Sequence, residues 1–448
     1  MLKPDPVFLL AFFPEIVYHC FMNEPDVIII GGGAAGCFAS IIAAEQGKRV
    51  LVIEPGKLMH KLGITGKGRC NLTNNCDTQT LLKNIKTNPR FLQSAFSRFT
   101  SADTMAFFER LGVRLKTERG NRVFPDSDSA LEVVGALKMH MNILGVKIIN
   151  DRTQQLVAGT NVHTTVKCER GSYSAPKIIL ATGGLSYPKT GSTGDGYKIA
   201  AALGHKIIPL KPALVPIITR EDVAELSGLT LKNVKLSLFS ADTNKTLYTE
   251  QGELLFTHFG ISGPLALTAS CYIRCDVGDA VPSVPQKSRM HERCAEDCAP
   301  YKILIDLKPA LDEKKLDLRL LRDFTENKNK QICNALDALL PKSIIPIVIS
   351  QANIQSDKPV NSITTAERGR LVSALKGLRF TFTGLRPIDE AVITDGGVDV
   401  REINPKNMES KLMPGLHFAG EIIDVAAFTG GYNLQIAFST AYAATMGD

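Results

Sequence analysis

Residues 26–54 read DVIIIGGGAAGCFASIIAAEQGKRVLVIE, and this stretch decides the fold. Its apolar start, 26–30, predicts a strand buried on both faces of a parallel sheet; residues 34–46 predict a helix and 49–53 a second strand. Between the first strand and the helix, Gly31, Gly33 and Gly36 form a G-x-G-x-x-G pattern. The first glycine permits a sharp turn, the second a close approach of the backbone to a pyrophosphate, and the third close packing of helix on strand.

An acidic residue, Glu54, ends the second strand. At that position a carboxylate would hydrogen-bond an adenosine ribose hydroxyl, while the helix N-terminus at Ala34 and Ala35 would face the diphosphate. Strand, glycines, helix, strand and acid together predict a site for an adenine dinucleotide. NAD and FAD both satisfy this unit, so the cofactor depends on the rest of the chain.

Length and composition set broad limits. A chain of 448 residues predicts two or three domains, and 44% apolar with 22% charged residues is ordinary for a water-soluble globular protein. The net charge of +7 is spread without long Lys/Arg blocks, which suits an anionic cofactor and does not by itself indicate nucleic acid. Ten cysteines without a regular framework indicate a reducing compartment, and hence the cytoplasm.

The amino-terminal segment, 1–22, contains an apolar patch at 7–13 that is too short to span a bilayer, so no membrane association is predicted. We expect Met22 to be the natural start and residues 1–22 to be an extension without a role in the fold. Four cysteines and His291 could in principle bind zinc. However, the cysteines of each pair are separated by three residues, which fits one turn of a helix better than the C-x-x-C spacing of a zinc knuckle, so no metal is predicted. The four cysteines are Cys271, Cys275, Cys294 and Cys298.

Glycine-rich loops follow two of the expected strands. Residues 57–76 are polar and too irregular for a helix; Lys61 and Arg69 there can meet phosphate. Residues 177–182 predict a strand that runs into Ala181, Thr182 and Gly183, where glycine again permits close approach to a ligand. Both loops are expected at the carboxyl edge of the sheet, where ligands bind in open α/β folds.

Three long motifs carry a resemblance to a known family. They are KLGITGKGRCNLTN at 61–74, THFGISGP at 257–264, and FAGE at 418–421 followed by TGGYNLQ at 429–435. In this order they resemble the HI0933-like (YhiN/BaiN-type) flavoproteins, over residues 24–446. One departure is visible: the family usually reads D-V-D where this chain has Asp424, Val425 and Ala426.

The return segment favours FAD over NAD. Residues 416–419 predict a last buried strand, and Thr429-Gly430-Gly431 opens an apolar helix over 432–444. An NAD-binding domain is complete without this second strand-to-helix connection. In two-part flavoproteins, the connection closes over the extended FAD, and the helix N-terminus faces the flavin. The predicted cofactor residues are Gly31, Gly33, Ala34, Ala35, Gly36, Glu54, Lys61, Gly68, Arg69, Ala181, Thr182, Gly183, Gly420, Glu421, Gly431, Asn433 and Leu434.

The predicted fold class is α/β: a two-part Rossmann-like FAD-binding domain with an inserted β-barrel module that carries an all-helical subdomain. Short apolar segments with turn residues between them predict the barrel, and helical spacing predicts the subdomain. The expected boundaries are 24–208 and 380–448 for the FAD-binding domain, 209–311 and 350–379 for the barrel, and 312–349 for the helices.

The predicted function is that of an FAD-dependent oxidoreductase, a reductase that passes hydride to an unsaturated or carbonyl small-molecule substrate. No second G-x-G-x-x-G lies between Gly36 and Gly420, so no dedicated NAD(P)H domain is expected. Reduced nicotinamide, NAD(P)H, is still a candidate transient electron donor that would visit the substrate pocket. The resemblance implies two alternatives, reduction of uridine in ribosomal RNA and amine oxidation by oxygen; a non-catalytic flavin carrier is a third. The weak catalytic candidates are His258, Cys70 and Tyr432. No oligomeric state is predicted.

Overall fold

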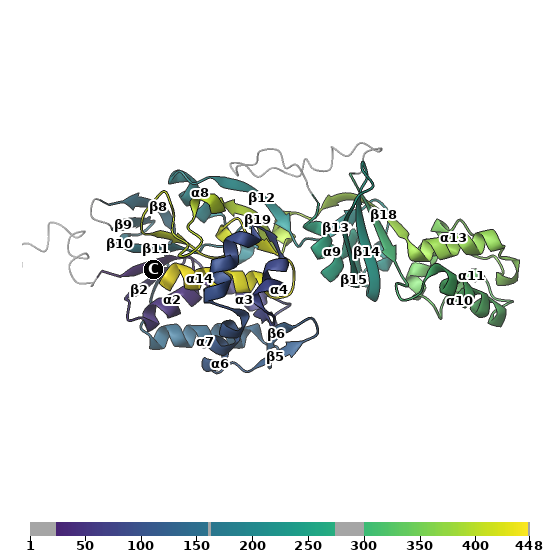
Figure 1. The fold of residues 1–448 in the computed structure, drawn as a ribbon, viewed down its shortest axis with the longest axis horizontal. Helices are drawn as coiled ribbons and strands as arrows, with labels where there is room; N and C mark the ends of the chain where they lie inside the picture. Colours follow the sequence, from purple (N-terminus) through teal and green to yellow (C-terminus); the bar gives the residue numbers. More distant parts are fainter. Residues whose placement is uncertain (1–23, 160–162, 274–299, 447–448) are drawn as a thin grey trace, which may run out of the picture.

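The computed structural model describes residues 24–159, 163–273 and 300–446. The molecule is elongated, with a mixed α/β domain at one end, a barrel in the middle and a group of helices at the other end (Figure 1). No helix among the described residues combines the length and the apolar character needed to cross a bilayer. The extension 1–22 and Cys275, His291, Cys294 and Cys298 lie outside the described residues.

The α/β domain is built on one parallel sheet of five strands. In spatial order these are β20 (Leu416–Phe418), β11 (Lys177–Leu180), β1 (Val27–Ile30), β2 (Val50–Ile53) and β7 (Lys147–Ile149). Helix α2 (Ala34–Glu45) leaves β1, and the last helix, α14 (Tyr432–Met446), packs beside α2 (Figure 1). The first and last parts of the chain therefore share one layer, which confirms the predicted two-part domain.

Two expectations about this domain were wrong. By sequence, residues 146–149 and 162–168 look like strands of a small antiparallel appendage, but β7 pairs with β2 in parallel because it follows α7 (Ala130–Ile143) and completes a crossover. The appendage is instead β8 (Thr153–Ala158), β9 (Thr164–Cys168) and β10 (Ser172–Ala175). Segment 57–76 is also more ordered than expected, since it contains α3 (His60–Ile64) and β3 (Thr73–Asn74).

The region between α3 and α7 packs a small sheet and several short helices near α14. Strand β3 pairs with β6 (Arg122–Pro125), which pairs with β5 (Leu115–Glu118). Before them come α4 (Thr78–Lys83) and β4 (Ile85–Thr87), and β4 pairs with β21 (Ala426–Ala427) of the return segment. The sequence of residues 88–112 predicts an amphipathic helix, but this segment is divided into η2 (Pro89–Leu92), α5 (Gln93–Arg98) and α6 (Ser101–Arg110). Thr100 and Asp103 form a capping box that starts a new helix.

A closed six-stranded barrel forms the middle of the molecule. Its strands, in spatial order, are β13 (Ile217–Thr219), β16 (Gly260–Ser262), β15 (Thr246–Thr257), β14 (Thr230–Ser240), β17 (Tyr301–Asp306) and β18 (Leu378–Leu385), with α9 (Gly263–Ser270) packed against them. The ribbon formed by β12 (Ile207–Ala213) and β19 (Ile393–Val398) leads from the α/β domain to the barrel. The expected boundaries at residues 209 and 380 fall inside β12 and β18.

The helical end contains α10 (Glu313–Glu326), α11 (Ile332–Ala335), α12 (Ile345–Gln351) and α13 (Thr365–Lys376). Helix α13 begins with a capping box of Thr364 and Glu367, as the sequence predicts. It packs against α10 and α12, although the expected boundaries assign it to the barrel. The barrel and these helices share one apolar core, whereas the α/β domain has its own.

Candidate flavin site

The glycine loop after β1 has the geometry that its three glycines predict. Gly31 has φ +103°, and a Cβ there would lie 2.5 Å from the Ala181 carbonyl oxygen. A Cβ on Gly36 would lie 1.9 Å from the Gly31 carbonyl oxygen, so only glycine lets α2 lie this close to β1. Gly33 has nothing within 4 Å of the position of a Cβ. The N-terminus of α2, with Ala34 and Ala35, therefore faces open space in which a diphosphate can approach the backbone.

Glu54 is fixed at the edge of this space. Its Oε2 accepts a hydrogen bond of 2.7 Å from the Gly32 amide and its Oε1 accepts one of 2.8 Å from the Gly56 amide. A carboxylate oxygen has further lone pairs, so both remain able to accept from ribose hydroxyls. This placement fits the predicted ribose contact.

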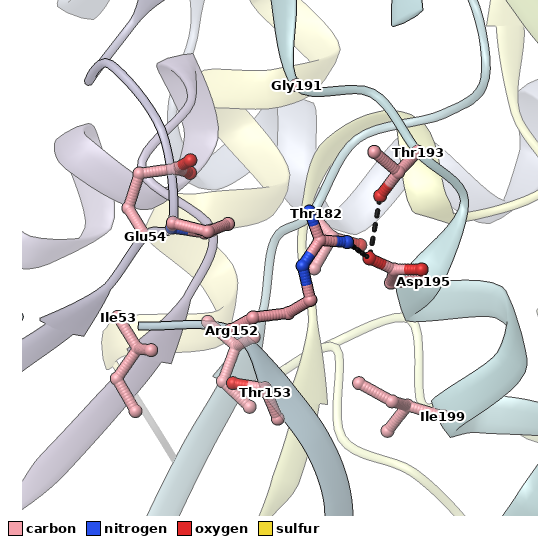
Figure 2. A pocket seen from close by; sticks show the side chains of 12 residues that line it. Ile53, Glu54, Arg152, Thr153, Thr182, Gly191, Thr193, Asp195 and Ile199 are labelled. Atoms are coloured by element: carbon pink, nitrogen blue, oxygen red, sulfur yellow. Dashed lines mark hydrogen bonds and ion pairs between the residues drawn. The ribbon is translucent and has the colours of Figure 1, made fainter. Parts of the chain in front are cut away.

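A cavity lies beside Glu54 at the carboxyl ends of β1, β2 and β11 (Figure 2). Thr182, predicted as a cofactor residue, lines it. Its Oγ1 is buried and has no hydrogen-bond partner among the described residues. Because a buried hydroxyl without a partner is costly, this atom indicates a polar ligand. The residues present therefore fit the adenosine part of an FAD.

The first and last parts of the chain meet again around Glu421. Its Oε2 lies 2.8 Å from Lys61 Nζ, across 360 residues of sequence. Lys61 also donates to Ser186 Oγ at 2.7 Å, and Glu421 Oε1 accepts from Ser186 Oγ at 3.0 Å and from the Thr394 amide at 2.7 Å. Next to it, Gly420 has φ +78°, and a Cβ there would lie 3.0 Å from that of Ala35. Lys61, Gly420 and Glu421 thus lie together near the N-terminus of α2, and their predicted contacts with the cofactor stay predictions.

The start of α14 is held against β3. A Cβ on Gly431 would lie 2.3 Å from the Thr73 carbonyl oxygen, so the two backbones are in close contact. The Asn433 side chain accepts from the Ala427 amide at 3.0 Å and donates to the Ala427 carbonyl at 2.9 Å, which closes the loop before the helix. Leu434 is half-buried against the core of the domain.

Two other predicted cofactor residues lie apart from these contacts. The guanidinium of Arg69 pairs with Glu118 and Asp128 and lies 4.2 Å from the ring centre of Phe124. The carbonyl of Gly68 accepts from the Ala130 amide at 2.7 Å. Their predicted contacts with the cofactor stay predictions.

The three catalytic candidates differ in their surroundings. Cys70 is fully buried, and burial raises the pKa of its thiol to about 12, which disfavours a reactive thiolate. Burial also raises the pKa of Tyr432 to about 12. His258 is exposed at the turn between β15 and β16, with its ring 4.9 Å from that of Phe259.

One feature of the site was missed by the sequence analysis, which described the charge as spread along the chain. Residues 57–98 contain eight of the 52 Lys and Arg residues but only one of the 45 acidic residues. The remainder of the chain has 44 of each sign, so this segment accounts for the whole net charge of +7. A running count of charge would have found it. The eight cations are Lys57, Lys61, Lys67, Arg69, Lys83, Lys86, Arg90 and Arg98.

The family model for the HI0933-like protein Rossmann domain matches residues 25–447. The chain belongs to this family. It is 31% identical over 428 residues to the ribosomal RNA dihydrouridine synthase of Escherichia coli (strain K12), covering 94% of this chain and 97% of that protein. It is 28% identical over 420 residues to the 3-dehydro-bile acid delta(4,6)-reductase of Clostridium scindens, covering 93% and 97%. Among solved structures, the open conformation of a flavocytochrome c3 fumarate reductase matches with 14% identity and a TM-score of 0.46, covering 99% of this chain and 81% of that one.

Membership in the HI0933-like family establishes the predicted class: the protein is an FAD-dependent oxidoreductase with a Rossmann-type FAD-binding domain. The site geometry is consistent with that cofactor through the open glycine loop, the fixed carboxylate of Glu54 and the unpartnered hydroxyl of Thr182.

Behind the Gly420–Glu421 turn lies a buried carboxyl, Asp424, that accepts from Asn88 Nδ2 at 2.9 Å. Burial, together with the neighbouring charge of Asp395, raises the pKa of Asp424 to about 6. Asp395 itself accepts from Thr87 at 2.8 Å and pairs with Lys211 at 3.1 Å. At neutral pH, the negative charge of ionised Asp424 is therefore poorly stabilised by its surroundings.

A first prediction compares two glycines of the loop. We expect Gly36→Ala to destabilise the fold by about 1–3 kcal/mol, because the new methyl group meets a backbone carbonyl that cannot move freely. Gly33→Ala should cost about 1 kcal/mol or less, as an N-cap change, but should weaken FAD binding at least tenfold. Thermal unfolding of the apoprotein and fluorescence titration with FAD measure the two effects. Equal FAD affinity of Gly33→Ala and the wild type would contradict the assigned site.

A second prediction concerns pH. Because the folded pKa of Asp424 is raised, its ionisation destabilises the fold above pH 6, and this penalty shrinks as the pH falls toward 4. We expect Asp424→Asn to stabilise the protein by up to about 3 kcal/mol at pH 8, raising the thermal midpoint by about 5 °C, with a smaller gain at pH 5. The control is Asp399→Asn: hydrogen bonds from Arg401 lower the pKa of that carboxyl, so this change should destabilise at pH 8. A pH-independent gain would contradict the explanation.

Proposed function

We propose that this flavoenzyme saturates a carbon–carbon double bond conjugated to a carbonyl group, and that its substrate is a uracil base in RNA. Saturation of a double bond is the chemistry that the names of both relatives describe. The choice of RNA rests on one observation, the position of the excess positive charge. Segment 57–98 carries that charge, and it includes the loop that supplies Lys61 to the site.

The cations of this segment fall into two groups. Lys61 forms an ion pair at the site, and Arg69 forms ion pairs away from it. The other six are exposed, and one of them, Lys86, lies over the ring of Tyr272; the six are Lys57, Lys67, Lys83, Lys86, Arg90 and Arg98. Exposed cations in a segment with few acidic residues attract the phosphate backbone of a nucleic acid. Binding releases counterions from the phosphates, and this release contributes favourable free energy to nucleic-acid binding in general. A small neutral substrate would gain nothing from this arrangement.

The chain's own residues would hold FAD through the α2 N-terminus, Glu54, Thr182 and the Lys61–Glu421 pair. Bound FAD supplies hydride chemistry. Reduction of the double bond then requires two electrons and two protons, delivered as one hydride and one proton. We propose reduced nicotinamide as the source of the hydride; without a second dinucleotide fingerprint in the sequence, it would have to enter by the substrate's route.

A second candidate substrate is a small cyclic enone. It is favoured by the apolar seam between the α/β domain and the barrel, where Ala426 packs with Leu214, Ile393 and Leu267. Ala426 is buried and stands where the resemblance leads us to expect an aspartate, so this seam is less polar than the resemblance predicts. A substrate pocket beside such a seam would hold a hydrophobic ring better than a nucleobase.

A third prediction separates the two substrates. Under anaerobic conditions with NADPH or NADH, we expect the protein to form dihydrouridine in ribosomal RNA faster than it reduces a cyclic enone. The double variant Lys83→Glu/Arg90→Glu should weaken RNA binding at least tenfold and lower the slope of log affinity against log salt by about 2, one for each phosphate contact. Flavin reduction by nicotinamide should stay unchanged.

The matched control for this variant is Lys235→Glu/Lys245→Glu, at two exposed residues of the β14–β15 hairpin of the barrel. It changes the net charge by the same amount but lies outside segment 57–98. Equal loss of RNA binding in both proteins would mean that net charge alone matters. Enone reduction that is fast and independent of salt, with no dihydrouridine formed, would favour the second candidate.

A further inference from the structure

A pair of opposite charges closes the cavity beside Glu54 on its far side (Figure 2). Arg152, just before β8, forms an ion pair through Nη1 with Oδ2 of Asp195, the first residue of α8 (Asp195–Ala202). Thr193 Oγ1 donates to the same carboxylate oxygen at 2.8 Å. The pair joins the three-stranded appendage to the start of α8, just after the glycine-containing loop 191–194, and these two parts of the chain share no sheet.

The backbone of Arg152 is firmly held. Its amide donates to Asp151 Oδ1 at 2.8 Å, and its carbonyl accepts from the Glu169 amide at 3.0 Å. Asp151 is buried and also accepts from the Arg170 amide at 3.2 Å. The long side chain of Arg152 therefore extends from a fixed point into the cavity, as Figure 2 shows.

The ion pair itself contributes little as a structural tie. The side chain of Arg152 is 42% exposed and that of Asp195 27% exposed, and ion pairs with such exposure typically contribute less than about 1 kcal/mol. The surroundings give Arg152 another use. In the described part of the chain it is the only cation lining the cavity, whose other charged residues are Glu54 and Asp195. Thr182 lines the same cavity, and its buried hydroxyl has no hydrogen-bond partner among the residues that the structure describes.

These observations fit an adenine nucleotide. A purine presents a flat ring on which a planar guanidinium stacks, and the adjoining phosphate is an anion that the same group can hydrogen-bond. Glu54 is placed for the ribose hydroxyls and Thr182 offers one more hydrogen bond. Asp195, which Thr193 holds in place, and Glu169, whose Oε1 lies 3.7 Å from Arg152 Nε, restrict the guanidinium to the side of the cavity opposite Glu54.

We propose that Arg152, positioned by Asp195, grips the adenylate half of FAD and gives the site its preference for the dinucleotide over FMN. The flavin half does not depend on this pair. Loss of Arg152 should therefore weaken FAD and ADP to a similar degree and leave FMN unaffected. The inference rests on FAD as the cofactor and is independent of which substrate the enzyme reduces.

The test is a titration of flavin-stripped full-length protein with FAD, FMN and ADP, followed by flavin fluorescence for the first two and by calorimetry for ADP. We expect Arg152→Ala to weaken FAD and ADP binding about tenfold, equal to about 1.4 kcal/mol, without change for FMN. Arg152→Lys should recover little, because an ammonium group cannot stack as a guanidinium does. Asp195→Asn should weaken FAD binding less than Arg152→Ala does.

The matched control is Arg110→Ala, which breaks an exposed bidentate pair with Glu45 on the α2–α6 surface, away from the cavity. It should leave all three affinities unchanged, and the thermal midpoints of the control and of Arg152→Ala should agree. An unchanged ratio of FAD to FMN affinity in Arg152→Ala would overturn the proposal, as would tighter binding of FAD. Neither result would bear on the choice between RNA and enone, which is measured by product formation.

Discussion

The contact between Lys61 and Glu421 is the point on which the site depends. It joins the loop after β2 to the turn after β20, and both loops leave the carboxyl edge of the same parallel sheet. With side chains 26% and 22% exposed, such a pair adds little to stability. Its effect is positional. It links the first and last segments of the chain near the N-terminus of α2, where the backbone of Gly420 packs closely against Ala35. One end of the chain alone would supply only half of a site for an extended dinucleotide.

Much of this arrangement was predictable from the sequence, and the reason is local. A few consecutive residues are enough to identify the G-x-G-x-x-G pattern, the buried strands and the apolar helices. The reason is that the periodicity of side chains and the backbone geometry of glycine are local properties of the sequence. The parallel order of the strands then brings their carboxyl ends to one edge without further information. Glu54, Thr182, Lys61 and Glu421 could be selected on this basis, and the structure brings them to that edge.

What could not be predicted depends on contacts between distant segments. Strand β7 is short and reads equally well as an appendage strand; only its place after α7 sets its parallel partner. Helix α13 looks separate along the chain but packs on α10. Arg152 and Asp195 have no common motif, since they come from an antiparallel sheet and a helix start that meet only in the folded protein. The excess positive charge of segment 57–98 was not predicted for a different reason. Its cations are interspersed with neutral residues, so they form no continuous block of Lys and Arg in the sequence.

A small apolar seam joins the barrel to the α/β domain, and here this chain departs from what the resemblance leads us to expect. Two connections reach the barrel, and one of them contains Leu214, which is buried with φ +53° and packs with Ala426 and Leu267. Beside this seam, Tyr272 of the barrel stacks on Phe428, just before the glycines that open α14, with ring centres 5.8 Å apart. An aspartate at 426 would place a charge inside an apolar contact, where it would need water or a partner. Alanine at this position removes that need, and the seam between the α/β domain and the barrel stays apolar where the two meet. The packing of Leu214, Leu267 and Ala426 therefore helps to fix the barrel against the part of the α/β domain from which α14 begins.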